Sequence, residues 1–564
     1  MIAFSDSPVV AEQQMTAIIY YMTTFGFIDG RFDITEEMEI RRWIRALVEM
    51  RVELMGIPEV ADRLPIIEKQ VAYFERIFVR VTGEVQALFD ETVAEGEQSV
   101  DFVLARLRLR CFELFRAFDS KSQWTLLFIV NRLLEADGIV HKNEAIFRDE
   151  LVELLRDDLP SEPPPPPAVA ASGPPPVTIE APRRAVATLT EHPFLQLNEE
   201  HYKRDPERLR EQLIRDHAIM AQAVEAWDAQ RAVGRGRLQG LTRVDQIVGP
   251  PFLDDFVYAL PDDGVDRELI VVGDLHGCYS CLKGALLQSD FFRKVVAHRE
   301  NPAENPEPKL VFLGDYVDRG RFSYDGILRT VLQLFVSMPE NVIVLRGNHE
   351  YYVDIGGRVS AGVAPAEAIA TYAPYLPKQM FDSFRYLFER MPAMLIVGKM
   401  LYVHAGIPRD ETLEARWRDL SSLNDSHIRF EMMWSDPTHA NFIPVELQRQ
   451  TARFPFGRQQ FRSFMERIGC HTLVRGHEKI DEGFKKIYED RGLLLLNLFS
   501  AGGRANVDLP ENASYRSVTP MAMTVRHVGG QTIVTPWPIE WETWNQPALN
   551  GFLRSPPEIE FRVT

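Results

Sequence analysis

Short apolar runs recur through the second half of the chain, and they predict a set of buried strands. The clearest are continuously apolar and rich in β-branched residues: Leu269–Val272, Leu310–Leu313, Val342–Leu345, Leu401–Val403 and the shorter Thr472–Val474. Strands covered on both faces typically show this pattern, whereas half-exposed strands alternate apolar and polar positions. Later runs predict three more strands, at 493–498, 521–525 and 532–534. We therefore expect an α/β (α+β) domain in this part of the chain.

The first part of the chain has a different pattern, with apolar positions at helical spacing over residues 11–157 and very little glycine or proline. That spacing predicts an all-helical region. Pro160–Pro182 follows, and a proline-rich stretch favours extended polyproline II over a helix or a sheet. A charged, helix-prone segment then spans His192–Gly249. The predicted organisation is an all-α domain at 1–157, a linker at 158–190, a helical connector at 191–250 and a catalytic domain at 251–564.

The helical region contains a repeated acidic motif. Asp29 precedes a glycine and is followed by Glu36, and Asp137 precedes a glycine and is followed by Glu144. The pattern resembles the TerB-like helical domain of tellurite resistance, in which paired acidic turns lie close together. Two interpretations remain: glycine-capped turns between helices, or four carboxylates that converge on a divalent cation such as Ca²⁺. The helical domain or the proline-rich linker is expected to provide the contact for a protein partner.

Composition narrows the classes of function. The chain has 564 residues, too many for one ordinary domain, and 45% of them are hydrophobic, enough for sizeable cores. Its formal net charge of -18 argues against a nucleic-acid partner, because phosphate backbones select basic surfaces. There are four cysteines, no charged-then-apolar leader at 1–10 and no long apolar run, which argues against export and membrane insertion. We therefore expect a cytoplasmic protein.

Five short segments that carry carboxylate, imidazole or amide groups follow the predicted strands. They are Gly273–Gly277, Gly314–Gly320, Arg346–Glu350, His404–Gly406 and Arg475–Glu478. One acidic residue after a strand is more often a helix cap than a ligand, but five such segments in this order indicate a built site. Side chains at strand ends can converge on one edge of a sheet. Mixed oxygen and nitrogen ligands suit a pair of divalent metals such as Mn²⁺, Fe or Zn²⁺.

The five segments together resemble the metallophosphoesterase signature in its phosphoprotein phosphatase form, over residues 268–528. The resemblance implies a four-layer α/β sandwich around a two-metal centre, which hydrolyses phosphomonoesters by direct attack of activated water without a covalent phosphoenzyme. Asp315 is expected to bridge the two metals. The full ligand set implied by the resemblance is Asp274, His276, Asp315, Asn348, His404 and His477.

The resemblance also implies roles for residues beside these ligands. His349 is expected to protonate the leaving alkoxide while Asp318 holds it in place. Arg319 and Asn348 are expected to bind the substrate phosphate. A planar guanidinium suits a phosphate dianion because it donates two parallel hydrogen bonds.

Two features depart from the family pattern. The second phosphate-binding arginine has unusual spacing before Phe456, so Arg453 is our assignment and Arg449 is the alternative. After the strand at 493–498, eukaryotic-type members continue with Pro-Asn-Tyr, whereas this chain has Gly502-Gly503-Arg504. The missing tyrosine leaves the substrate-facing wall of the site without an assigned residue.

Two substrate classes fit the sequence. Tyr316–Asp318 and Trp434–Pro437 resemble the Ser/Thr protein phosphatases. Gly277–Tyr279 and His404–Pro408 are more similar to the bacterial and phage branch, which includes dinucleoside tetraphosphate hydrolases. We favour a phosphoprotein substrate, mainly because of Trp434–Pro437. An inactive phosphatase fold that serves as a scaffold is the third alternative, and the complete set of expected ligands argues against it.

Overall fold

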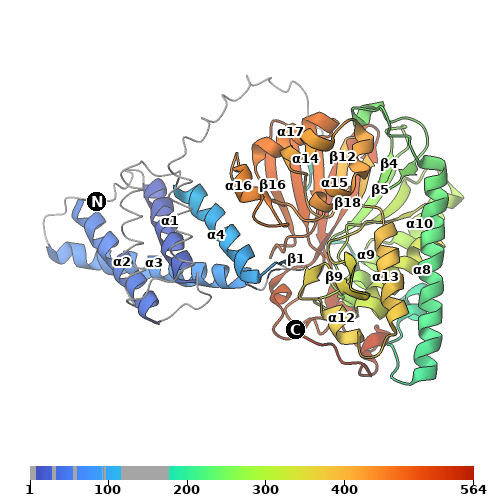
Figure 1. The fold of residues 1–564 in the computed structure, drawn as a ribbon, viewed down its shortest axis with the longest axis horizontal. Coiled ribbons are helices and arrows are strands. Elements are labelled where there is room, and N and C mark those ends of the chain that lie inside the picture. The colour runs from blue at the N-terminus through green and yellow to red at the C-terminus, as the bar shows by residue number, and fades with distance from the viewer. Residues whose placement is uncertain are drawn as a thin grey trace. The chain divides into compact units, whose positions relative to one another are not determined.

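A computed structural model describes residues 8–27, 34–54, 60–89, 91, 93–94, 97–115 and 177–563. The chain divides into two compact units (Figure 1): Met1–Ala168 with Pro444–Thr451, and Val169–Ile443 with Ala452–Thr564. Within the described ranges, every helix is too short or too polar to span a lipid bilayer.

The described part of the N-terminal unit is mainly helical. Its elements are α1 (Pro8–Gly26), α2 (Ile34–Leu54), α3 (Val60–Leu88), the short strand β1 (Val93–Ala94), α4 (Ser99–Phe115) and α16 (Val445–Gln448). Helix α3 packs against α1 and α2, and α1 also packs against α4. The acidic residues of the repeated motif lie outside the described residues: Asp29, Asp137, Glu144 and the side chain of Glu36. The Ca²⁺ site and the TerB-like assignment therefore stay predictions.

The C-terminal unit contains two mixed β-sheets (Figure 1). The six-stranded sheet has the order β2-β19-β18-β5-β6-β7, formed by Thr178–Ile179, Gln531–Pro538, Met521–Val528, Arg267–Val272, Glu307–Phe312 and Val342–Val344. The seven-stranded sheet has the order β16-β17-β15-β12-β11-β4-β3, formed by Phe484–Asp490, Leu493–Leu498, Thr472–Arg475, Met400–Val403, Met394–Val397, Val257–Leu260 and Phe252–Asp254. Each strand predicted from an apolar run is present in one of these sheets.

Parallel neighbours in both sheets bring strand ends to one edge. Strands β5, β6 and β7 are parallel to one another, and so are β12, β15 and β17. The two groups meet where β5 and β17 end: Asp274 and Phe499 form an isolated parallel bridge, and Gly273 N donates to Ser500 Oγ at 2.8 Å. Gly273 permits this approach, because a Cβ there would lie 2.3 Å from the Leu498 carbonyl oxygen. The predicted ligands follow strands that end at this seam between the sheets.

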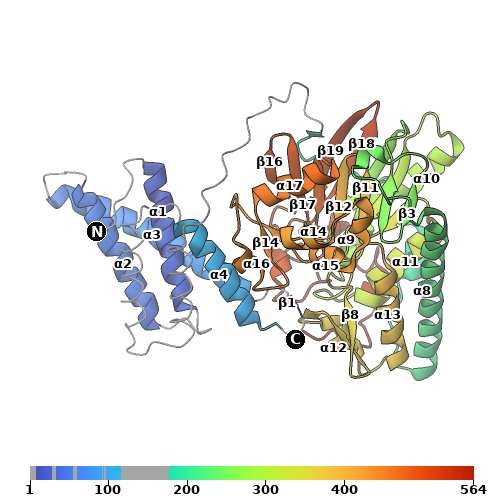
Figure 2. The same ribbon diagram turned by 45° about the horizontal axis from the view of Figure 1, so that its top comes forward.

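Helices pack against both sheets (Figures 1 and 2). Helix α10 packs against β6 and α11 against β7, while α17 shares a hydrophobic core with β12, β15 and β17. The elements between the main strands are α9 (Tyr279–Gln288), α10 (Phe291–Glu300), η2 (Ser323–Leu328), α11 (Arg329–Ser337), β8 (Tyr352–Ile355), β9 (Arg358–Ala361), β10 (Val363–Ala364), α12 (Glu367–Tyr372), α13 (Lys378–Arg390), α14 (Asp410–Arg416), η3 (Leu420–Asn424), α15 (Ser426–Met432), β13 (Asp436–Pro437), β14 (Pro455–Phe456), α17 (Arg458–Ile468) and η4 (Ser514–Ser517). Two short helices, η5 (Trp541–Trp544) and η6 (Gly551–Leu553), follow the last strand, β19. The C-terminal part therefore has the expected α/β character.

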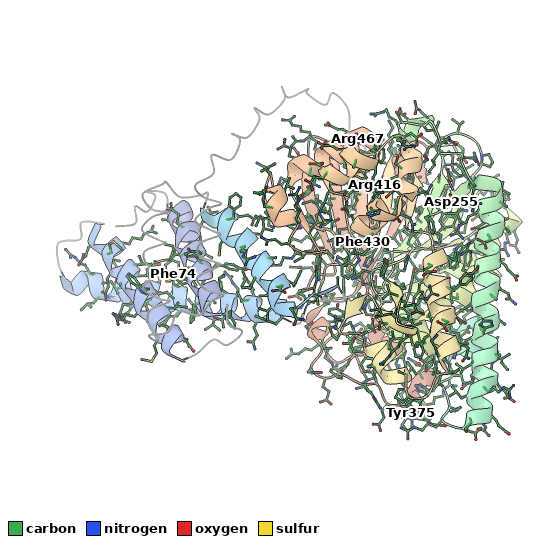
Figure 3. All side chains as sticks on the ribbon, viewed as in Figure 1. Phe74, Asp255, Tyr375, Arg416, Phe430 and Arg467 are labelled. Carbon is green, nitrogen blue, oxygen red and sulfur yellow. The ribbon has the colours of Figure 1, made fainter. Side chains whose placement is uncertain are left out.

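The predicted connector contains α7 (Pro193–Asn198), α8 (Pro206–Gly234) and η1 (Val244–Gln246). Helix α8 packs against α11, α13 and β3, and it lies along one side of the C-terminal unit in both ribbon views (Figure 2). Asp216 of α8 pairs with Arg329 at 2.8 Å, and Arg235 pairs at 2.7 Å with Asp255, which Figure 3 labels beside α8. Residues 178–179, which the sequence assigns to the linker, pair with β19 and so extend the six-stranded sheet.

Candidate metal centre

The structure brings the predicted ligands together in the interior. All are buried where strands end: Asp274 and His276 after β5, Asp315 after β6, Asn348 after β7, His404 after β12 and His477 after β15. Among the described residues, five of the eight non-glycine residues with positive φ belong to the predicted site: His276, Asp315, Asp318, Arg319 and His477. Left-handed backbone is costly for such residues and concentrates at functional sites.

The first group of acceptor atoms surrounds His276. Its Nδ1 lies 3.0 Å from the carbonyl oxygen of Val317, so the proton sits on Nδ1 and a lone pair remains on Nε2. Nε2 faces Asp315 Oδ2 at 3.4 Å and Asp274 Oδ2 at 3.9 Å. A lone pair directed at carboxylate oxygens is repelled unless a proton or a metal cation lies between them. Together with His349, His276 and Asp315 form a group whose ligand atoms lie close enough together to hold a metal ion, and Asp274 lies beside it.

The second group centres on His404, whose Nδ1 lies 3.1 Å from the carbonyl oxygen of Leu313. Its Nε2 lies 2.9 Å from Asn348 Oδ1, 3.1 Å from His477 Nδ1 and 3.3 Å from Asp315 Oδ1. All four atoms are acceptors when the imidazole protons lie on His404 Nδ1 and His477 Nε2. If the Asn348 amide is turned by 180°, its NH₂ group can donate to His404 Nε2 at 2.9 Å. In the present orientation the amide oxygen faces other acceptors, and a cation between them would remove the repulsion.

Burial sets the protonation of these groups. It raises the pKa of Asp274 to about 7, and it raises the pKa of Asp315 well above its usual value, with the charges of Asp274 and Glu350 adding to the effect. Burial also lowers the pKa of three imidazoles well below 6.5: His276, His404 and His477. Neutral imidazole is the form that binds metals, and a divalent cation stabilises buried carboxylates. Among the described residues, His477 Nε2 is buried with no hydrogen-bond partner. The donor set fits divalent metals.

His349 lies beside the first group with one ring nitrogen engaged. Its Nδ1 is 2.7 Å from Asp318 Oδ2, and Asp318 Oδ1 accepts from Ala368 N at 2.7 Å. The other nitrogen, Nε2, lies 3.9 Å from Asp315 Oδ2. The His349 and Asp318 pair therefore presents Nε2 to the centre, where it can donate or accept a proton.

Two arginines bring positive charge to the same region. Burial, followed by the charges of Arg319 and Arg453, lowers the pKa of His349 well below its usual value. Arg319 Nη1 donates to Glu367 Oε1 at 3.0 Å, and Arg453 Nε donates to Asp436 Oδ2 at 2.7 Å. Both predicted phosphate-binding arginines thus act electrostatically on His349, and each lies against a carboxylate.

Two glutamates of the site were not predicted from the sequence. Glu350 accepts from the backbone N–H groups of Asp315 and Tyr316, each at 2.8 Å, and so shapes the loop that carries Asp315. Glu350 ends the segment 346–350, which also carries predicted site residues, so its position in the sequence could have indicated a role in the site. Glu367 accepts from Arg319, and no motif of the sequence marks it.

Asp436 and Tyr515 were missed as well. Asp436 pairs with Arg475 at 2.7 Å in addition to Arg453, and its place in 434–437 was a signal. Tyr515 lies with its hydroxyl 3.5 Å from His276 Nε2. Nothing in the sequence around Tyr515 indicates a site, since only the path of the chain brings it there.

Residues 268–481 match the family described as calcineurin-like phosphoesterase. A probable serine/threonine-protein phosphatase of Encephalitozoon cuniculi is 25% identical over 238 residues, which is 42% of this chain and 47% of the relative. A serine/threonine-protein phosphatase of Caenorhabditis elegans is 26% identical over 245 residues, which is 42% of this chain and 48% of the relative. The chain thus spans about half the length of these curated relatives. A solved protein serine/threonine phosphatase from Saccharomyces cerevisiae covers 57% of this chain and 89% of its own, with 18% identity and a TM-score of 0.36.

The C-terminal part, with its α/β fold and mixed sheets, is therefore similar over residues 268–481 to calcineurin-like phosphoesterases. The two curated relatives that match this part are named serine/threonine-protein phosphatases. The family uses divalent metals, and the His and Asp groups of the centre lie close enough together to bind them.

Proposed function

We propose that the chain is a two-metal Ser/Thr protein phosphatase that hydrolyses phosphomonoesters. The sharing of Asp315 between two groups of buried acceptors supports this most directly: Oδ2 lies 3.4 Å from His276 Nε2, and Oδ1 lies 3.3 Å from His404 Nε2. A carboxylate between two metal positions is suited to an in-line displacement at phosphorus. Mn²⁺ is the proposed metal, and Fe or Zn²⁺ suits the same donors.

The ligands divide between the two metal positions around Asp315. When bound, the ions supply Lewis-acid activation of water and neutralise the phosphate. The chain contributes a buried, preorganised set of donors that needs little rearrangement during the reaction. Asp274 and His276 would hold the first ion together with Asp315, and Asn348, His404 and His477 would hold the second; all of these side chains are buried.

His349 delivers the proton to the leaving oxygen. Asp318 accepts from Nδ1 at 2.7 Å, which orients the ring and stabilises the imidazolium form. The transferable proton is then on Nε2, the nitrogen that faces the centre. Burial raises the pKa of Asp318 to about 6 and lowers that of His349 well below its usual value, so in this proposal His349 gains its proton only once the phosphate dianion is bound beside it.

Arg319 binds the phosphate group together with Asn348 and Arg453. Glu367 accepts one N–H of Arg319 at 3.0 Å, which orients the guanidinium before substrate binds. A planar guanidinium suits phosphate because its donors lie in one plane and can form two parallel hydrogen bonds.

Phosphoserine and phosphothreonine proteins are the proposed substrates. Both curated relatives are named serine/threonine-protein phosphatases. Trp434 and Asp436 of the segment 434–437 are buried beside His477, with ring centroids of Trp434 and His477 6.4 Å apart and Asp436 Oδ1 3.7 Å from His477 Nε2. In this proposal the helical N-terminal unit, TerB-like, docks a protein partner, and the protein acts in the cytoplasm.

The test compares phosphoserine and phosphothreonine peptides with a dinucleoside tetraphosphate, each with and without Mn²⁺. Faster, Mn²⁺-dependent turnover of the peptides supports the proposal. Preference for the nucleotide would make the protein a phosphoanhydride hydrolase instead. No turnover of either substrate by the Mn²⁺-loaded full-length chain would favour a scaffold.

A further inference from the structure

Two buried thiols meet where the turn after β5 enters α9. Cys278 is the residue before the first residue of α9, and Cys281 follows it by about one helical turn. Both are free thiols and both are fully buried. Their Sγ atoms lie 3.0 Å apart. The sulfurs of a disulfide lie about 2 Å apart, so a further approach of about 1 Å would join Cys278 and Cys281 covalently.

The loop after β17 holds these two thiols in place. Asn506 Nδ2 donates to Cys278 Sγ at 3.0 Å and to the carbonyl oxygen of Gly502 at 2.8 Å. Asp508 Oδ2 accepts from the backbone N–H of Ser280, the residue before Cys281, at 2.6 Å. Segments far apart in the sequence therefore keep the sulfur atoms against each other.

The same turn carries His276, a predicted metal ligand. Cys278 N donates to the carbonyl oxygen of Leu275 at 2.8 Å, which closes the turn around His276, and His276 N donates to the carbonyl oxygen of Asp315 at 2.9 Å. His276 has a φ of +42°, a conformation that is costly for a residue with a side chain and persists only where its surroundings impose it. A displacement of Cys278 would therefore also displace the imidazole of His276.

We propose that Cys278 and Cys281 are a modification site: hydrogen peroxide converts them to a reversible disulfide, which lowers phosphatase turnover. One sulfur first attacks the peroxide, so that an S–O bond forms, the O–O bond breaks, and the hydroxide released takes the thiol proton and leaves as water. The other sulfur then attacks this sulfenic acid; the S–S bond forms, the S–O bond breaks, and a second water leaves. The two thiols lose two electrons and the peroxide gains them. The effect on turnover rests on the proposed function, whereas the disulfide does not.

Packing is the simpler role for Cys278 and Cys281, because a buried thiol behaves as a small apolar group. Burial raises the pKa of Cys281 well above its usual value, which slows attack on the peroxide since the thiolate is the nucleophile. Hydrogen peroxide is nearly as small as water and reaches buried groups when the structure opens locally. We therefore expect the disulfide to form over minutes to hours.

The test exposes the full-length, Mn²⁺-loaded protein to hydrogen peroxide, removes the peroxide and alkylates the remaining thiols in denaturant. Trypsin then releases one peptide, Glu268–Lys283, that contains both cysteines. In oxidised molecules this peptide should resist alkylation and be lighter than the dithiol form by two hydrogen atoms. As it accumulates, turnover of a phosphoserine peptide should fall by about tenfold, because a misplaced His276 disturbs the proposed centre. Dithiothreitol should reverse both changes.

Cys281→Ala removes one of the two thiols, and Cys470→Ala is the matched control, since Cys470 is a single buried cysteine on another strand connection. We expect Cys470→Ala to form the disulfide and lose turnover as the wild type does. Cys281→Ala should keep its turnover after peroxide. An equal loss in Cys281→Ala that dithiothreitol restores would overturn the inference, because the loss would then need no disulfide.

The wild type alone also decides the question. If Cys278 and Cys281 are still alkylated in samples whose exposed Met38 is oxidised, the thiols only pack. A disulfide that leaves turnover unchanged would equally overturn the inference. A protein that forms the disulfide, yet hydrolyses no phosphopeptide even when reduced, would contradict the proposed function instead. In that case Mn²⁺ should still raise the Tm of the reduced protein more than that of the oxidised protein, because the turn that carries His276 is changed.

Discussion

Glu367 accepts a hydrogen bond from Arg319, with Oε1 and Nη1 3.0 Å apart, and the two side chains are 7% and 12% exposed. Glu367 is the first residue of α12, and the next residue, Ala368, donates its N–H to Asp318 Oδ1 at 2.7 Å. One helix start therefore holds both the proposed phosphate-binding arginine and the carboxylate that orients His349. Displacement of α12 would disturb phosphate binding and proton transfer together.

Glu367→Ala is expected to raise KM about tenfold, because Arg319 loses a carboxylate that orients it. The free energy of unfolding should also fall by about 2 to 3 kcal/mol, since a largely buried guanidinium loses one of the charges that stabilise it. Steady-state kinetics and urea unfolding measure the two effects. Glu389→Ala is the control: Glu389 pairs with Arg385 at 2.6 Å on the surface, and its loss should change stability by less than about 1 kcal/mol. An unchanged KM in Glu367→Ala would refute the positioning role.

Asp315→Asn is expected to abolish metal-dependent turnover, because the proposed centre depends on a carboxylate shared by both metals. Without metal, the variant should be at least as stable as wild type, since burial and neighbouring negative charges raise the pKa of Asp315 well above its usual value. Mn²⁺ should raise the Tm of the wild type and have little effect on the variant. Thermal unfolding with Mn²⁺ and with a chelator tests this. Mn²⁺-dependent turnover by Asp315→Asn would contradict the ligand assignment.

Asp436→Ala is expected to be strongly destabilising. Asp436 is fully buried and lies 2.7 Å from both Arg453 and Arg475, so its removal leaves two buried guanidinium groups without this shared carboxylate. The free energy of unfolding should fall by about 3 to 5 kcal/mol. The control is Asp382→Ala, which removes the partner of Lys378 in a surface pair at 3.5 Å. Similar unfolding midpoints for the two variants in urea would show that the buried network contributes little.

His527 is expected to make folding sensitive to acid. Its Nδ1 lies 3.0 Å from Thr532 Oγ1 on the neighbouring strand, and burial lowers its pKa from 6.5 to about 4. A lowered folded-state pKa stabilises the protein above pH 6.5, and this contribution is lost as the pH falls toward 4. Between pH 7 and pH 5, the wild type should lose about 1 to 2 kcal/mol more than His527→Gln in urea unfolding. Equal losses would show that His527 titrates normally in the folded protein.

The strands and the clustering of candidate ligands could be predicted because short, local sequence patterns indicate both. A continuous apolar run such as Leu269–Val272 has few alternatives to a buried strand, and it became part of β5. Asp274 follows a strand of the six-stranded sheet and His404 follows a strand of the seven-stranded sheet, so parallel pairing could place each of them only at an edge of its own sheet. The meeting of the two sheets brings them together. The roles assigned to them stay predictions until the variants above are measured.

Other features depend on contacts between distant parts of the chain and left no local pattern. Tyr515 reaches His276 only because the segment between β17 and β18 passes the turn after β5, and Glu367 meets Arg319 through the placement of α12. Residues 178–179 lie next to a proline-rich stretch and were assigned to the linker. Pairing with β19 near the other end of the chain places them in a sheet instead.

The bridge between Asp274 and Phe499 also bears on how a newly made molecule becomes active. Each sheet supplies only part of the ligand set, because His404 and His477 follow strands of the seven-stranded sheet. Strand β18, which pairs with β5 inside the six-stranded sheet, leaves the ribosome after all the ligands. We expect activity to appear late in synthesis, in one step. Prematurely terminated chains that lack β18 should then be inactive and should not act as unregulated phosphatases.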